Sequence, residues 1–117
     1  MNDIARKALL YDFYGELLTE HQKKVYEDAV MNDYSLSELA EEYGVSRQGI
    51  HDLLKRCDAI LEDYEAKLGL MKRFESLKNT AKEIQVDLDR LKEISDSSEH
   101  TSLIDELKEK MSEIEQL

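Results

Sequence analysis

The chain has 117 residues, a formal net charge of −11 and 37% charged residues, with no proline, no tryptophan and four glycines. This composition favours long helices, because strands need turn residues and β-branched runs that are missing here. The length suits one core with an appendage and is too short for two full cores. Strong acidity excludes sequence-independent binding of nucleic acid over the whole surface, so any such contact must be local.

Cysteine usage and hydropathy bear on the cellular compartment. Cys57 is the single cysteine and cannot form an internal disulfide, which suits a reducing cytoplasm. No apolar stretch approaches the length of a membrane span, and the opening MNDIARKALL lacks the pattern of a secretory signal. We therefore expect a cytoplasmic protein without membrane insertion.

Four helices are predicted in the first part of the chain. The first covers about residues 4–18. The capping box TEHQ at 19–22 begins the second helix, which ends near residue 31. The capping box SLSE at 35–38 begins the third helix. Gly44 permits the positive φ of a sharp helix end, and Ser46 is positioned to cap the fourth helix.

The third and fourth helices have the spacing of a helix-turn-helix, with a short turn that contains glycine. The positions that must be apolar to wedge these two helices together are Leu39, Tyr43, Val45, Ile50 and Leu53. On the fourth helix, one side collects Ile50, Leu53, Leu54 and Cys57, and the other collects Arg47, Gln48, His51, Asp52 and Lys55. A polar face that starts at a helix N-terminus is the arrangement that reads base edges in the major groove.

The start of the fourth helix is also locally basic. Residues 46–57 carry Arg47, Lys55 and Arg56 against one acid, Asp52, a local balance of +2. Arginine suits guanine or phosphate, and the amide of Gln48 suits adenine. The candidate nucleic-acid-binding residues are Ser46, Arg47, Gln48, His51, Lys55 and Arg56. The alternative is a solvated face on a helical bundle.

The last third of the chain has a different pattern. Apolar positions alternate in steps of four and three, which is the seam of a coiled coil: Leu70, Phe74, Leu77, Ala81, Ile84, Leu88 and Leu91. The segment SDSSEHTS at 95–102 interrupts this seam, and a last helix continues the spacing through Ile104 to Ile114. The pattern predicts an arm for dimerisation or partner docking, and the alternative is a helical hairpin that folds back on its own domain.

Residues for catalysis are scarce. The three histidines, His21, His51 and His100, have no metal-ligand spacing with one another or with Cys57. There is no glycine-rich phosphate loop and no nucleophile with a base at a readable spacing. We expect no enzyme activity, no cofactor and no metal, and we expect Cys57 to be a packed thiol.

Residues 18–61, LTEHQKKVYEDAVMNDYSLSELAEEYGVSRQGIHDLLKRCDAIL, resemble region four of the primary bacterial sigma factors in the LTE.Q entry and the S..E.A...GVSR core. The whole chain, with its ALLYDFYGELLTEHQ opening and charged helical tail, more closely resembles the YlxM family of small bacterial helix-turn-helix proteins, encoded beside the genes for the signal recognition particle GTPases. This resemblance implies a DNA-binding regulator in the signal recognition particle pathway. Sigma-type helices have further basic or amide residues at the positions of Gly49, His51 and Asp52, so DNA contacts carry over to Arg47, Gln48 and Lys55.

Together these patterns predict an all-α protein: a helix-turn-helix bundle of about four helices in residues 1–68, then a coiled-coil-like helical arm in residues 69–117. The first part holds 8 basic and 15 acidic residues, a net charge of −7, so two copies would have to act together on DNA. We expect a DNA-binding regulatory protein that forms a homodimer through the arm. The alternative is an adaptor that docks on the protein or RNA of the signal recognition particle and reads no DNA sequence.

Overall fold

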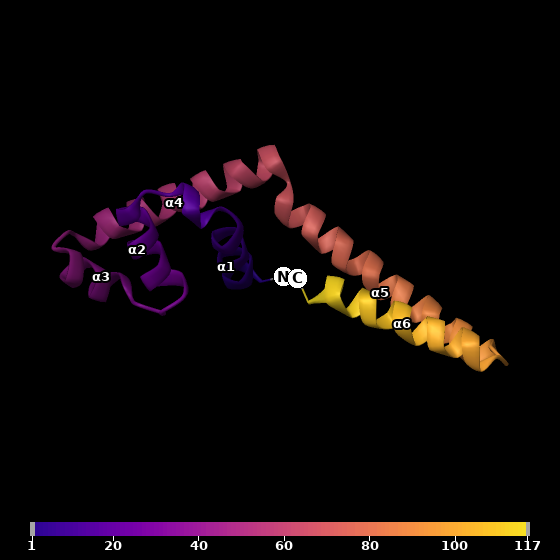
Figure 1. Cartoon of the computed structure of the whole chain (residues 1–117). Coiled ribbons are helices and arrows are strands. Elements are labelled where there is room, and N and C mark those ends of the chain that lie inside the picture. Colours follow the sequence, from indigo (N-terminus) through magenta and orange to yellow (C-terminus); the bar gives the residue numbers. More distant parts are fainter. Residues whose placement is uncertain (1, 117) are drawn as a thin grey trace. The chain divides into compact units, whose positions relative to one another are not determined.

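The computed structural model describes residues 2–116, and in this part of the chain every regular element is a helix (Figure 1). The predicted all-α class is confirmed. The chain divides into two compact units, Met1–Met71 and Lys72–Leu117. None of the helices among the described residues combines the length and apolar character needed to span a bilayer.

The first unit contains α1 (Asp3–Tyr14), a 3₁₀ turn η1 (Gly15–Leu17), α2 (Glu20–Val30), α3 (Leu36–Tyr43) and α4 (Arg47–Leu68). Both predicted capping boxes are present. The Thr19 hydroxyl accepts from the Gln22 amide at 3.2 Å and the Gln22 side chain accepts from the Thr19 amide at 3.0 Å. The Ser35 and Glu38 pair has the same reciprocal bonds. Gly44 has a φ of +66°, the left-handed conformation predicted for the end of α3.

The first helix is shorter than predicted, because α1 ends at Tyr14 and Gly15 begins η1. A Cβ placed on Gly15 would come within 2.9 Å of the Tyr11 ring, so a glycine at this position leaves room for that ring. The Tyr11 ring then stacks on Tyr26 of α2, with the ring centres 5.7 Å apart.

The long helix α4 lies at the centre of the first unit. Its first half supplies Ile50 to a small cluster with Val25 of α2 and Leu39 of α3, and all three are buried. Farther along the helix, Cys57 and Leu61 belong to a larger cluster shared with α1. The predicted inner side of this helix is confirmed. The prediction that Val45 packs between α3 and α4 is wrong. This residue lies in the turn and is 49% exposed, and Leu39 and Ile50 fill the contact between the two helices.

Tyrosine hydroxyls connect the helices of this unit through carboxylates. Burial, followed by the bond to Glu27, raises the pKa of Tyr11 to about 12, and the bond to Asp28, followed by burial, raises the pKa of Tyr43 to about 12. The hydroxyls therefore remain protonated donors at neutral pH. The four bonds run from Tyr11 to Glu27 at 3.0 Å, from Tyr14 to Glu65 at 2.6 Å, from Tyr26 to Asp58 at 2.7 Å and from Tyr43 to Asp28 at 2.8 Å.

One of these bonds also organises the α4–α5 junction. Gly69, with a φ of +62°, ends α4, and α5 (Leu70–Ile94) begins at the next residue. The amide of Leu70 donates to the Tyr14 hydroxyl at 3.1 Å, and the amide of Met71 donates to Glu65 at 3.0 Å. These two amides belong to the first turn of a helix, which has no partners within the helix itself.

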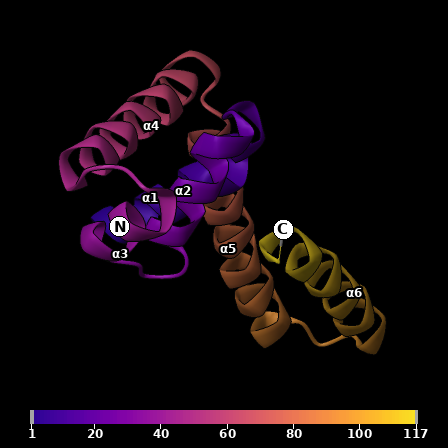
Figure 2. The ribbon, with the colours of Figure 1, turned by 90° about the vertical axis from the view of Figure 1, so that its left-hand side faces the viewer.

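The second unit consists of most of α5 and of α6 (Ser98–Glu115). The two helices lie side by side and run in opposite directions as a hairpin (Figure 2). Ion pairs join Lys92 to Asp105 at 2.8 Å and Lys108 to Asp89, and the Gln85 amide donates to the Lys108 carbonyl at 2.8 Å. Within the arm, α6 therefore folds back on α5.

The predicted coiled-coil seam splits between two sides of α5. Ala81 and Leu88 are buried and Phe74 is half-buried. The remaining seam residues are exposed: Leu70 by 41%, Leu77 by 45%, Ile84 by 38% and Leu91 by 48%. A single neighbouring helix covers only one side of such a seam, so half of the apolar positions have no cover in the hairpin.

We predict that Tyr14→Phe lowers the free energy of unfolding by about 1–3 kcal/mol, because the Leu70 amide and the Glu65 carboxylate each lose a partner in a part-buried setting. Urea unfolding followed by circular dichroism measures this loss. Tyr64→Phe is the matched control, since the Tyr64 ring stacks on Tyr14 and its hydroxyl has no hydrogen bond among the described residues. Equal losses in the two variants would show that the hydrogen bonds do not stabilise the junction.

Candidate nucleic-acid interface

The N-terminus of α4 is fixed by a cap. Ser46 has extended backbone angles, and its hydroxyl accepts from the Gly49 amide at 2.9 Å, as predicted. A Cβ on Gly49 would lie 3.2 Å from that hydroxyl oxygen, which is tighter than ordinary contact. The glycine in the first turn of α4 is thus explained by the space that the cap requires.

Packing against α3 sets the rotation of α4 about its axis. Leu39 and Ile50 meet in the buried contact between the two helices, and the short turn through Gly44 brings them together. The outward side then carries the predicted residues. Ser46, Arg47, Gln48, Lys55 and Arg56 are exposed, and His51 is half-exposed.

The cations of the first unit fall into two groups. Arg6, Lys7, Lys23 and Lys67 each form an ion pair with a carboxylate. Among the described residues, Arg47, Lys55, Arg56 and Lys24 have neither an ion pair nor a hydrogen bond. Three of these four side chains lie on α4, within its first three turns. We call Arg47, Lys55 and Arg56 the α4 cations.

An acid is placed among the α4 cations and binds a predicted site residue. The Gln48 amide donates to Asp52 at 2.9 Å, and Nδ1 of His51 lies 3.7 Å from the same carboxylate oxygen. Gln48 would have to leave Asp52 before both of its amide hydrogens could face a base. The sequence contains the signal for this bond, because residues four apart are neighbours on a helix surface.

A shallow hollow of about 240 Å³ brings three of the predicted residues together. It is lined by Arg47, Gln48 and His51 of α4 and by Leu36 of α3. Leu36 was not among the candidate residues named from the sequence, although it is half-buried at the start of α3 and lies beside the site. The hollow is smaller than typical small-molecule pockets, and Lys55 and Arg56 lie farther along α4.

Within the described residues, this site holds neither a metal-binding cluster nor an accessible thiol. Within residues 2–116, no three His, Cys, Asp or Glu side chains lie together in a group able to hold a metal ion. Cys57 lies on the inner side of α4, fully buried, and burial raises the pKa of its thiol to about 11. The arrangement supplies exposed cations and hydrogen-bonding groups on one helix, which makes it a candidate binding surface.

The packing of α3 and α4 and the exposed start of α4 define a helix-turn-helix protein. In agreement, the sequence matches over residues 1–101 the family UPF0122, described as "Putative helix-turn-helix protein, YlxM / p13 like". The chain belongs to this family.

Individual relatives match over most of their length. The chain is 39% identical over 113 residues to a UPF0122 protein of Thermoanaerobacter sp. (strain X514), which covers 97% of both chains. It is 41% identical over 114 residues to a UPF0122 protein of Acetivibrio thermocellus, again covering 97% of both. A UPF0122 protein of Listeria welshimeri is 46% identical over 83 residues, 71% of this chain and 76% of the relative.

We predict that Ser46→Ala destabilises the first unit by about 1 kcal/mol, because the Gly49 amide loses its acceptor. Thermal or urea unfolding followed by circular dichroism measures the change, and the effect on ligand binding should be larger, since the same turn positions Arg47. Ser37→Ala is the control, as this exposed serine of α3 has no hydrogen bond of its side chain within the described chain. If Ser46→Ala changes neither stability nor binding, the cap does not hold the interface.

Proposed function

We propose that this protein is a DNA-binding regulatory protein that places the first turns of α4 in the major groove. The observation that carries the proposal is the set of α4 cations, which remain without a carboxylate partner in a unit whose net charge is −7. Free cations on the exposed side of a recognition helix are the groups that phosphates and base edges attract.

Each residue has a distinct role in this proposal. Arg47, in the first turn and nearest the bases, contacts guanine or phosphate. Lys55, two turns later, binds phosphate, and Arg56 lies toward the flank and contributes less. Ser46 fixes the turn, and Gln48 and His51 face the groove floor once Gln48 exchanges Asp52 for a base.

The acidity of the chain sets a condition on this function. The surrounding carboxylates repel DNA, so one copy would have a low affinity for DNA and two copies acting together would have a higher affinity. We therefore propose a homodimer that assembles through the arm in the cytoplasm. We further propose that this regulator acts in the signal recognition particle pathway, as its resemblance to YlxM proteins implies.

A second candidate function rests on α3. This helix crosses the DNA backbone in helix-turn-helix complexes, and here it carries exposed Glu38, Glu41 and Glu42. Three acids at that position repel phosphate and would suit a basic surface on a partner protein. The second candidate is thus an adaptor that docks on the signal recognition particle through the same helices and does not read DNA.

We predict that Arg47→Ala reduces sequence-specific binding most, whereas Lys55→Ala weakens binding to all sequences alike and lowers the salt slope by about one unit. Arg56→Ala should have a smaller effect. Asp52→Asn should strengthen non-specific binding, because it removes a negative charge near the phosphates and keeps an oxygen for Gln48. The measurement is a fluorescence titration of these variants with duplex DNA and with structured RNA at two salt concentrations.

The same titration separates the two candidate functions. If the unmodified protein binds neither duplex DNA nor RNA at low salt, and Asp52→Asn does not restore binding, the DNA-binding proposal is wrong. Partners recovered from lysate that survive nuclease treatment would then support the adaptor. Loss of those partners on nuclease treatment would support the nucleic-acid function.

A further inference from the structure

The hairpin of the second unit exposes more large apolar side chains than it buries. Among its described residues, Ala81, Leu88 and Ile104 are buried. The exposed set contains Leu77, Ile84, Val86, Leu91, Ile94, Leu103 and Leu107, with exposed fractions from 37% to 77%. Apolar surface on this scale marks an association site.

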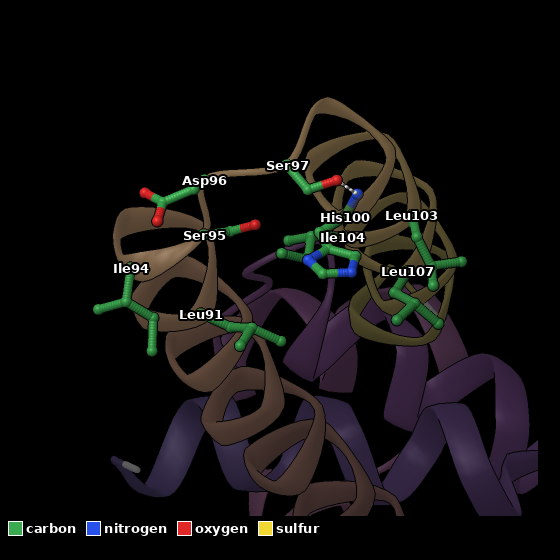
Figure 3. Close-up of a pocket in the computed structure, with 9 residues that line it drawn as sticks. All are labelled: Leu91, Ile94, Ser95, Asp96, Ser97, His100, Leu103, Ile104 and Leu107. Atoms are coloured by element: carbon green, nitrogen blue, oxygen red, sulfur yellow. Dashed lines mark hydrogen bonds between the residues drawn. The ribbon is translucent and has the colours of Figure 1, made fainter.

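Apart from Val86, these exposed apolar side chains line one groove or belong to a row on α5 that meets the groove at Leu91. Near the connection between the helices, Leu91 and Ile94 of α5 and Leu103 and Leu107 of α6 line one groove of about 670 Å³ (Figure 3). From Leu91 the face continues along α5 through Ile84 to Leu77, one residue per heptad. The groove and this row therefore form a single surface.

The residues between the apolar ones give this surface a self-complementary charge pattern. The exposed strip of α5 runs Arg73, Leu77, Thr80, Ile84, Asp87 and Leu91, in alternating steps of four and three. Arg73 lies seven residues before Thr80 and Asp87 lies seven residues after it. Within the described chain, neither Arg73 nor Asp87 has an ion pair or a hydrogen bond.

We propose that this strip binds the same strip of a second copy, with the two α5 helices antiparallel and a two-fold axis near Thr80. In this register Leu77 of one copy faces Ile84 of the other, and Arg73 of one copy faces Asp87 of the other. Each contact occurs twice, as a two-fold interface requires. An in-register parallel pairing would instead place Arg73 against Arg73 and Asp87 against Asp87, which is unfavourable.

This dimer would supply the two copies that the proposed function requires, and only its biological role rests on that function. The dimer itself can be tested without nucleic acid. A chain that dimerises as described but binds no DNA would contradict the proposed function and leave this inference intact, and a DNA-binding monomer would do the reverse.

The charge pattern allows a test in which two defects restore each other. We expect Arg73→Asp alone, and Asp87→Arg alone, to raise the dimer dissociation constant about tenfold, since each replaces two attractions by two repulsions. The variant that carries both changes should return to the affinity of the unmodified chain. A mixture of the two single variants should form a heterodimer, because every pair across that interface is then opposite in charge. Lys82→Asp is the matched control, an exposed cation on the other side of α5.

Sedimentation equilibrium of the full chain and native mass spectrometry of the mixture measure these outcomes. Ile84→Lys should give monomers, whereas Val86→Lys, at a similarly exposed position off the strip, should leave the dimer intact. Circular dichroism verifies that each variant keeps its helix content. An unmodified chain that is monomeric at 100 micromolar would overturn the proposal. So would a dimer for which the double variant is no better than the single ones, and this would point to a parallel dimer or to another occupant of the face.

Discussion

The hydrogen bond from a tyrosine hydroxyl to a carboxylate is the interaction on which the first unit depends. Four such bonds link α1, α2, α3 and α4 to one another, and the two partners in each bond are at least 15 positions apart in the chain. A hydrogen bond to a charged group contributes about 1.5–3 kcal/mol, so together they are a large share of the stability of a small unit. Four of the 15 acids in residues 1–68 therefore have this structural use.

The same interaction explains how one helix serves both as scaffold and as binding surface. In the second half of α4, Asp58, Glu62 and Glu65 are engaged by Tyr26, Arg6 and Tyr14. In the first half, the α4 cations have no carboxylate partner among the described residues. The bonded acids and the unpaired cations thus lie in different halves of one helix. The half with the cations is the exposed start of α4, which belongs to the helix-turn-helix.

The features that could be predicted from sequence are those decided by neighbours along the chain. The two capping boxes, the Gly44 turn and the Ser46 cap each depend on residues at most three positions apart, and all are present. The tyrosine bonds could not be predicted, because composition does not say which distant carboxylate a hydroxyl will meet. Val45 was assigned to the core wrongly because an apolar residue in a tight turn does not have to face inward.

The residues of the candidate site could be grouped from the sequence, but the contacts among their side chains were not predicted. Spacing alone brought Arg47, Gln48 and His51 to one side of α4, and the structure places them around one hollow. The hydrogen bond from Gln48 to Asp52 could have been predicted, because the two residues are four positions apart on a helix. This bond was not predicted, because each side chain was considered separately. In the arm, the seam predicted an apolar stripe correctly, but a heptad pattern does not tell which side of it a neighbouring helix will cover.

The free cations also limit how the proposed complex can work. Three cations per copy neutralise about three phosphates, which corresponds to a salt slope of about −2.7, typical of weak and unspecific contact. Two copies bound together would contact about six phosphates, which doubles the salt slope to about −5.4. In the proposed function, pairing supplies most of the affinity for DNA, so the arm and the start of α4 would serve the same function.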